Sequence, residues 1–220
     1  VYDILKDNEG GLWITTYFGG INYSNPNSSN FTIRHCATES ARGRIISKFH
    51  EDKNGDIFIG TDDGGLFIYN PIKDKCHRYT IDKSNPNLNI HAIWSNDTYL
   101  WIGTYSKGLY RINHKTKYVE HIPYFEKDGI TNESIYSIHE DLSGKIWIGT
   151  KTAIWTWTKK HGFIKEKELG YNSDIIAICE DLKGSIWFAS LNKGILKYTP
   201  TTHNITHISK GSNGIKIPNE

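Results

Sequence analysis

Apolar residues in this chain fall in short runs that are separated by turns rich in Asp, Asn, Ser and Gly. In one stretch the runs cover residues 134–140, 145–150, 153–158 and 163–168, and they contain many Ile, Trp and Tyr. Runs of this length and composition are typical of β-strands, whereas no useful stretch has the 3.6-residue period of a helix. The runs are nearly continuous in apolar residues, which favours strands buried on both faces. This stretch is therefore predicted to form one four-stranded sheet.

The same pattern recurs five times along the chain, and an aromatic residue in the second strand marks each copy. The markers are spaced by 40 to 46 residues and are Trp13, Phe58, Trp101, Trp147 and Trp187. Units of this length that bury their faces against neighbours indicate a repeat architecture. We predict an all-β protein, a β-propeller with five four-stranded blades in a single domain over residues 1–220. The predicted blades cover residues 1–43, 44–88, 89–132, 133–172 and 173–215.

The turn between the first and second strands reads Asp-x-x-Gly in four of the units, at residues 7–10, 52–55, 141–144 and 181–184. Asp accepts hydrogen bonds from nearby backbone amides, and Gly supplies the positive φ of such a hairpin. We therefore interpret these carboxylates as turn formers. The marker aromatics recur at one structural position, so we expect them to pack between adjacent blades.

Two histidines align in the first strand of their units, but their position does not support a shared chemistry. The residues at this position are Leu5, His50, Trp94, His139 and Cys179. A position that also accepts Leu, Trp and Cys does not carry a general base. We predict no catalytic residue there.

Composition narrows the classes of function. The chain has 26 basic and 24 acidic residues, so it shows no electrostatic footprint for nucleic acid or an anionic membrane. The sequence contains no apolar run of about 18 residues, so no membrane-spanning helix is predicted. The chain starts at Val1 inside a strand pattern and contains no Met, so we interpret it as a piece of a longer protein.

The three cysteines, Cys36, Cys76 and Cys179, are far apart in sequence and have no metal-binding spacing. We expect them to be buried or half-buried free thiols. We predict neither a metal site nor a cofactor.

Two stretches carry a resemblance to a known family. Residues 138–150 contain Ile-x-Glu-Asp-x-x-Gly-x-Ile-Trp-Ile-Gly-Thr, and residues 65–71 read Gly-Leu-Phe-Ile-Tyr-Asn-Pro. Both stretches resemble the two-component regulator propeller repeat, and the similarity extends over all five units. The resemblance implies a seven-bladed propeller, often one of two in tandem, of which this chain is a fragment. A shorter match at residues 184–188 resembles the propellers of streptogramin lyases.

The resemblance also implies a function and a location. Propellers of this family form the periplasmic sensor part of inner-membrane hybrid two-component regulators in Bacteroidetes, and their ligands are mostly oligosaccharides. We therefore expect a non-enzymatic sensor that relays a signal to a histidine kinase outside this chain. The expected partners are an oligosaccharide, the remaining blades or a second propeller of the parent protein, and a second copy in a homodimer.

The candidate ligand site lies in the loops that join the second strand to the third and each blade to the next. These loops share one face of a propeller and differ between the five units, as binding loops do. Their aromatic rings can stack on sugars, their polar groups can bind hydroxyls, and their arginines can pair with acidic groups. The predicted ligand-binding residues are Tyr17, Phe18, Arg42, Arg44, Asp62, Asp63, Tyr105, Lys107 and Asn192.

Two other functions are compatible with this sequence. The first is a propeller hydrolase or lyase acting on a glycan, although the Glu-Asp pairs repeat around the wheel, whereas glycoside hydrolysis needs two converging carboxyl groups. Asp62 and Asp63 form the only unrepeated acidic pair on the favoured face. The second is a protein-interaction scaffold, and the polar loop at residues 24–30 on the opposite face is a spacer or a partner contact in this interpretation.

Overall fold

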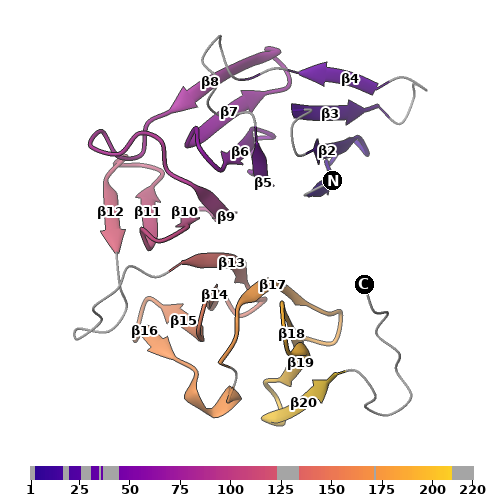
Figure 1. Ribbon diagram of the computed structural model, residues 1–220, viewed down its shortest axis with the longest axis vertical. Helices are drawn as coiled ribbons and strands as arrows, with labels where there is room; N and C mark the ends of the chain where they lie inside the picture. The colour runs from indigo at the N-terminus through magenta and orange to yellow at the C-terminus, as the bar shows by residue number, and fades with distance from the viewer. Residues whose placement is uncertain are drawn as a thin grey trace.

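The computed structural model describes residues 3–16, 20–25, 31–34, 36, 45–122, 134–170 and 172–209. It contains five four-stranded antiparallel sheets, each built from four strands that are consecutive in sequence. Figure 1 shows these blades following one another along an arc, with the first strand of each blade on the inside. The predicted all-β propeller with five four-stranded blades is confirmed.

The strands of each blade follow in chain order. Blade 1 contains β1 (Ile4–Lys6), β2 (Leu12–Thr16), β3 (Gly20–Ser24) and β4 (Phe31–Arg34). Blade 2 contains β5 (Ile46–Glu51), β6 (Ile57–Thr61), β7 (Leu66–Asn70) and β8 (Lys75–Tyr79). Blade 3 contains β9 (Ile90–Ser95), β10 (Tyr99–Thr104), β11 (Leu109–Asn113) and β12 (Val119–Ile122). Blade 4 contains β13 (Ile135–Glu140), β14 (Ile146–Thr150), β15 (Ile154–Thr158) and β16 (Gly162–Lys165), followed by the 3-10 turn η1 (Lys167–Leu169). Blade 5 contains β17 (Ile175–Glu180), β18 (Ile186–Ser190), β19 (Gly194–Thr199) and β20 (Asn204–Ile208).

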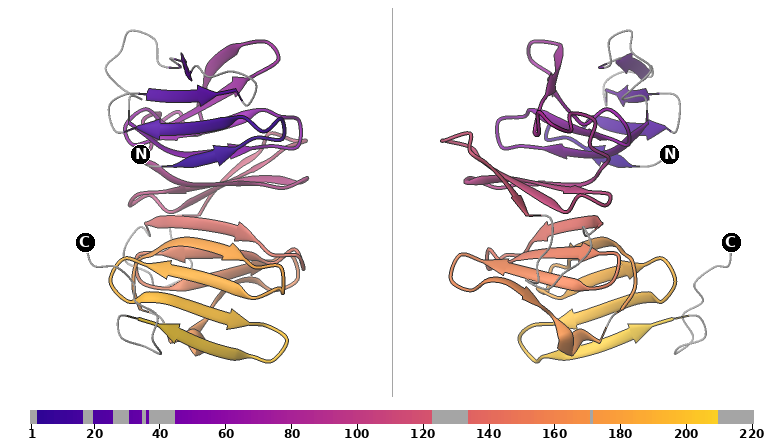
Figure 2. Two further views of the ribbon diagram at one scale, coloured as in Figure 1. Left: turned by 90° about the vertical axis from the view of Figure 1, so that its right-hand side faces the viewer. Right: turned by 60° about the vertical axis from the view of Figure 1, so that its left-hand side comes forward.

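The strands run across the thickness of the arc, so the turns lie at its two faces (Figure 2). We call one of them the turn face; it carries the turns from first to second and from third to fourth strand. The link face is the opposite one and carries the loops from second to third strand and the links between blades. Among the described residues, no helix is long and apolar enough to cross a membrane.

Each hydrophobic core lies between two neighbouring blades, and the marker aromatic of the earlier blade packs into it. The four buried markers are Trp13, Phe58, Trp101 and Trp147, with at most 6% of their surface exposed. Ile186 and Phe188 of β18 face blade 4, so the alternation of the strand turns Trp187 to the opposite side. Trp187 is only half-buried there. The prediction that the markers pack between blades is therefore confirmed for the four junctions in this chain.

Glycine at the end of the second strand lets the next blade approach closely. A Cβ atom on Gly60 would lie 2.7 Å from Cγ2 of Ile90, and one on Gly103 would lie 2.5 Å from Cγ2 of Ile135. Blade 1 instead has Thr15 at this position, and blade 5 has Ala189. The junction between blades 1 and 2 therefore cannot be packed in the same way as the junctions that follow it.

The two ends of the arc present uncovered sheet faces. Blade 1 exposes Ile4 by 58% and Leu12 by 39%, and blade 5 exposes Cys179 and part of Trp187. In Figure 1 these blades lie at opposite ends of an open arc. The corresponding faces of the inner blades are covered by a neighbour.

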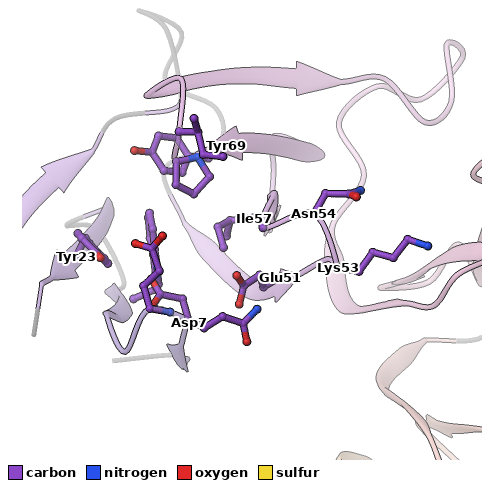
Figure 3. A pocket seen from close by; sticks show the side chains of 13 residues that line it. Asp7, Tyr23, Glu51, Lys53, Asn54, Ile57 and Tyr69 are labelled. Carbon is purple, nitrogen blue, oxygen red and sulfur yellow. The ribbon is translucent and has the colours of Figure 1, made fainter.

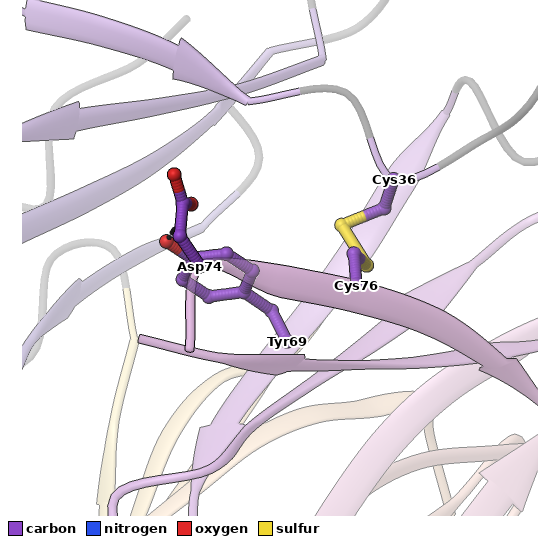
Figure 4. Close-up of a disulfide and its surroundings, with 4 residues drawn as sticks. All are labelled: Cys36, Tyr69, Asp74 and Cys76. Atoms are coloured by element: carbon purple, nitrogen blue, oxygen red, sulfur yellow. Dashed lines mark hydrogen bonds between the residues drawn. A yellow bond between two sulfur atoms is a disulfide. The ribbon is translucent and has the colours of Figure 1, made fainter. Parts of the chain in front are cut away.

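A disulfide joins Cys36, which follows β4, to Cys76 in β8 (Figure 4). The expectation that these two residues are free thiols is therefore wrong. Their separation of 40 residues is close to one repeat, so they occupy the outer edges of adjacent blades, and their Cα atoms are 5.3 Å apart. Cys179 is a free cysteine and is exposed rather than buried.

Candidate functional site

The first strand of four blades carries one extra residue close to its start on the link face. The register with the second strand shifts there, and the extra residues are Ser47, His91, Tyr136 and Ile176. A β-bulge of this kind redirects a side chain and is frequent next to functional sites. The four side chains differ in chemistry although the backbone around them is the same.

His91 brings together side chains from three blades on the link face. Its Nε2 lies 3.4 Å from Oδ1 of Asp62, which belongs to the loop between β6 and β7. The ring of Tyr105 stacks on His91 with centroids 5.7 Å apart, and the ring of Tyr136 lies at 5.8 Å. We call Asp62, His91, Tyr105 and Tyr136 the His91 group.

The His91 group is accessible and carries both aromatic and polar surface. Tyr105 is 46% exposed, while the side chains of His91 and Asp62 are 29% and 30% exposed. Burial raises the pKa of Tyr136, and the negative charge of Asp174 acts in the same direction, so its hydroxyl stays protonated and can donate a hydrogen bond. Such a group can stack on a planar or ring-shaped ligand and form hydrogen bonds with its polar groups.

The structure brings only some of the predicted ligand-binding residues close together. Asp62 and Tyr105 belong to the His91 group, whereas Asn192 is exposed in the β18–β19 turn of blade 5. The carbonyl of Lys107 bonds to Nε2 of His121 in β12 at 2.7 Å, which ties its backbone to the outer strand. Asp63 is half-buried beside Asp62. Tyr17, Phe18, Arg42 and Arg44 lie outside the described residues.

His91 and Tyr136 were missed because they lie in strands and not in loops. Each follows an Ile at the start of the first strand, where the sequence alone indicates an ordinary strand of the hydrophobic core. A signal was present: the residue after this Ile is Ser, His, Tyr or Ile in the four units, while the Ile itself is the same in all four. The bulge explains why such a position is free to vary, because its side chain leaves the regular alternation.

The repeated Glu-Asp pairs have structural roles, which removes them as candidate acid and base. Oε2 of Glu140 accepts hydrogen bonds from Nε1 of Trp94 at 3.2 Å and from Nδ2 of Asn96 at 2.9 Å, both in blade 3. Oε2 of Glu180 accepts one from the backbone N–H of Leu142 in blade 4 at 2.9 Å. Each Glu therefore reaches back to the preceding blade. Within the described part of the chain, no group of His, Cys, Asp and Glu is arranged to hold a metal ion.

A cavity of about 410 Å³ opens on the turn face between blades 1 and 2 (Figure 3). It lies on the face opposite to the predicted site. Its lining combines aromatic, apolar and charged side chains, including Asp7, Glu9, Trp13, Tyr23, Glu51, Lys53, Ile57 and Tyr69. The volume is in the range of small-molecule pockets.

No family model matches the chain. A curated relative, histidine kinase P4 of Formosa agariphila, is 26% identical over 138 residues, which are 60% of this chain and 10% of that protein. The chain thus spans about a tenth of the length of this relative.

Several solved structures share the fold. The extracellular domain of the hybrid two component system BT3049 from B. thetaiotaomicron matches 98% of this chain and 29% of its own, with a TM-score of 0.80 and 20% identity. That of BT4673 from the same organism matches 98% of this chain and 34% of its own, with a TM-score of 0.73 and 19% identity. Virginiamycin B lyase from Staphylococcus aureus matches 96% of this chain and 70% of its own, with a TM-score of 0.75 and 17% identity.

The chain spans about a third or less of the length of the two extracellular domains. Their fold and the sequence relation to a histidine kinase agree with the resemblance seen in the repeats. The predicted resemblance is therefore confirmed: this chain has the propeller fold found in the extracellular domains of hybrid two-component systems.

Proposed function

We propose that this chain is part of the extracytoplasmic sensor of a hybrid two-component regulator and binds an oligosaccharide at the His91 group. The observation that carries the proposal is the exposed convergence of Asp62, His91 and Tyr105 on the link face of a sensor-type propeller. Binding of the sugar would bias the regulator toward one state, which a histidine kinase outside this chain would transmit.

The chemistry of the His91 group supports a sugar ligand. Aromatic faces such as that of Tyr105 stack on the apolar side of sugar rings, and its 46% exposure leaves area for this contact. The carboxylate of Asp62 accepts hydrogen bonds from hydroxyls, and the hydroxyl of Tyr136 donates them. Nothing in this group requires a cofactor.

The disulfide supports a location outside the cytoplasm. Disulfides persist in oxidising compartments such as the bacterial periplasm and are rare in the cytosol. Cys36 and Cys76 join adjacent blades in this way. We therefore propose that the chain lies in the periplasm, as the sensor part of an inner-membrane protein.

The uncovered end faces support a larger assembly. Ile4 and Leu12 at one end, and Cys179 and Trp187 at the other, correspond to positions that a neighbour covers in the inner blades. We propose that further blades of the parent protein cover them and that the parent protein is a homodimer. Solution scattering tests the first point, because a monodisperse open monomer of this chain would contradict the need for a cover.

Titration calorimetry with a panel of plant and host oligosaccharides tests the sugar site. We expect one class of oligosaccharide to bind, and Tyr105→Ala or His91→Ala to weaken binding at least tenfold. Tyr118→Ala is the matched control, because Tyr118 is 69% exposed and lies in blade 3 outside the His91 group. If the intact ectodomain bound no oligosaccharide of the panel, or if all three variants lost affinity equally, the proposal would be rejected.

A lyase is the second candidate function, because virginiamycin B lyase shares the fold and Nε2 of His91 lies 3.4 Å from Asp62. A carboxylate beside an imidazole is an arrangement that can support a general base. Incubation with the same glycans, followed by chromatography of the products, distinguishes the two functions. Release of product that is lost in Asp62→Ala and His91→Ala would favour the enzyme over the sensor.

A further inference from the structure

Three blades place a cation of their own chain over the marker Trp. Cζ of Arg111 lies 5.1 Å from the ring centroid of Trp101. Nζ of Lys145 lies 4.6 Å from that of Trp147, and Nζ of Lys197 lies 4.8 Å from that of Trp187. Such contacts are attractive because the face of an aromatic ring is electron-rich. The carboxylate partners of these cations are Glu120, Glu166 and Asp181.

Blade 1 lacks this cation within the described part of the chain. In the strand register, Tyr23 pairs with Trp13 as Arg111 pairs with Trp101 and Lys197 with Trp187. The position that corresponds to Lys145 is Gly11, where a Cβ atom would lie 2.4 Å from the ring of Tyr23. An aromatic ring therefore stands in the place of the cation, at a centroid distance of 4.6 Å from Trp13.

Carboxylates nevertheless line this junction, and one of them, Asp7, occupies the position of Asp181 in blade 5. Asp7, Glu9 and Glu51 line the cavity, and Lys53 is the only basic residue among the described residues of its lining. Nζ of Lys53 is 2.6 Å from Oδ1 of Asp97 in blade 3, and Figure 3 shows its side chain extending away from Glu51. Among the described residues, no ion pair neutralises Glu9 or Glu51. Burial and the charge of Asp7 raise the pKa of Glu51, and hydrogen bonds to the backbone and side chain of Asn8 in blade 1 offset only part of this effect.

The lining favours an organic cation over a metal ion. Tyr23 and Ile57 give the cavity an aromatic and apolar wall, and no metal-binding arrangement exists among the described residues. A cavity of about 410 Å³ is also far larger than a bare ion needs. A ligand that carries an ammonium group on a carbon skeleton matches both parts of the lining.

We propose that the cavity between blades 1 and 2 binds a small organic molecule with a primary ammonium group. The ammonium group meets the carboxylates of Glu9 and Glu51, and the carbon skeleton lies against Tyr23 and Ile57. The ligand thereby brings a cation to a junction whose described residues place none over the marker Trp. This site is on the turn face and is independent of the His91 group.

Titration calorimetry of the full chain with glucosamine, N-acetylglucosamine and putrescine tests this proposal. We expect at least one of the two amines to bind, and N-acetylglucosamine, which lacks the charge, to bind at least tenfold more weakly or not at all. Binding of glucosamine alone identifies an amino sugar, and binding of putrescine identifies a flexible amine. Failure of both amines to bind, or equal binding of N-acetylglucosamine, would overturn the proposal.

Two variants assign the binding to this cavity. Glu51→Gln keeps the shape of the side chain and should weaken amine binding at least tenfold, whereas Glu168→Gln in η1 should leave it unchanged. Tyr23→Lys copies Lys197 of blade 5 and should supply the cation from within, so that amine binding is lost while the thermal midpoint is kept or raised. Unchanged binding in Glu51→Gln, or in a folded Tyr23→Lys variant, would place the ligand elsewhere.

Discussion

Oδ2 of Asp141 accepts a hydrogen bond from the indole Nε1–H of Trp147 at 2.7 Å. Oδ1 of the same carboxylate accepts the backbone N–H groups of Ser143 and Lys145, so one side chain closes the turn and holds the marker aromatic. The equivalent distances are 2.8 Å from Asp7 to Trp13 and from Asp181 to Trp187. The Asp of the repeat therefore couples the hairpin to the core between blades.

The second blade lacks the indole, so it shows which group binds the Asp carboxylate when no Trp is present. There Phe58 replaces Trp, and Oδ2 of Asp52 instead accepts Nδ2–H of Asn54 at 3.0 Å. The third blade carries Asn96 in place of Asp, and Nε1 of Trp101 has no hydrogen-bond partner among the described residues. The Asp and the Trp of the motif are therefore paired in function, and each loses its partner where the other is replaced.

Asp141→Asn should lower the free energy of unfolding by about 2 kcal/mol, because a buried charge-assisted hydrogen bond is lost. Asp52→Asn should cost about half as much or less, since no indole depends on Asp52. Urea unfolding of both variants measures the difference, and a double-mutant cycle with Trp147→Phe isolates the coupling. Equal losses in the two blades, or no coupling in the cycle, would contradict a dual role for Asp141.

Arg111 is enclosed by three rings at the junction of blades 3 and 4. Its Cζ lies 4.7 Å from the centroid of Tyr99 and 4.8 Å from that of Trp157, in addition to Trp101, and its Nε donates to Glu120 at 3.0 Å. Arg111→Met should lower the unfolding free energy by about 2 kcal/mol through loss of cation–π attraction in a desolvated site. Lys197→Met at the uncovered end should cost no more than about 1 kcal/mol. A larger loss at Lys197 than at Arg111 would show that burial does not strengthen these contacts.

His50 should make the stability of this chain sensitive to acid. Burial lowers its pKa from 6.5 to about 4, and Asp52 and the backbone of Ser95 offset only part of this effect. The unfolded chain therefore binds a proton at a higher pH than the folded chain. The contribution of neutral His50 to the free energy of unfolding is present in full above pH 6.5 and is lost as the pH falls toward about 4. The loss over this window is about 3 kcal/mol.

His50→Leu tests this pH dependence, because Leu5 occupies the same position in blade 1. Urea unfolding across the window should show a smaller loss of stability in the variant than in the native chain. His139 also has a pKa lowered by burial and should retain its own contribution. Parallel pH profiles of the two proteins would show that His50 is not buried in its neutral form.

The disulfide between Cys36 and Cys76 should stabilise the junction of blades 1 and 2. A disulfide that closes a loop over a separation of 40 residues lowers the entropy of the unfolded chain. This loss raises the free energy of unfolding by about 3 to 4 kcal/mol. Reduction with dithiothreitol should therefore lower the unfolding midpoint in urea, and the Cys179→Ser variant should respond in the same way as the native chain. No change on reduction, confirmed by thiol counting, would contradict this stabilisation.

Part of the candidate site was predictable and part was not. Asp62 and Tyr105 were found because loops that differ between repeats are where binding residues collect. His91 and Tyr136 were not, because a bulge in the first strand turns them toward the link face, and a bulge depends on how two strands pair. The cavity was missed for a similar reason, since its walls come from three turns and five strands that belong to two different blades.

The repeated local signals of the sequence by themselves determined the five blades, the order of their strands and the packing role of the marker aromatics. Strand length, turn chemistry and the alternation of apolar residues act over a few residues, so each unit carries them in full. Only the tertiary structure decided which cysteines pair, which side chains join His91 and where a cavity opens. These features arise between blades, where distances depend on residues such as Thr15 and Gly60 that set how closely two sheets approach.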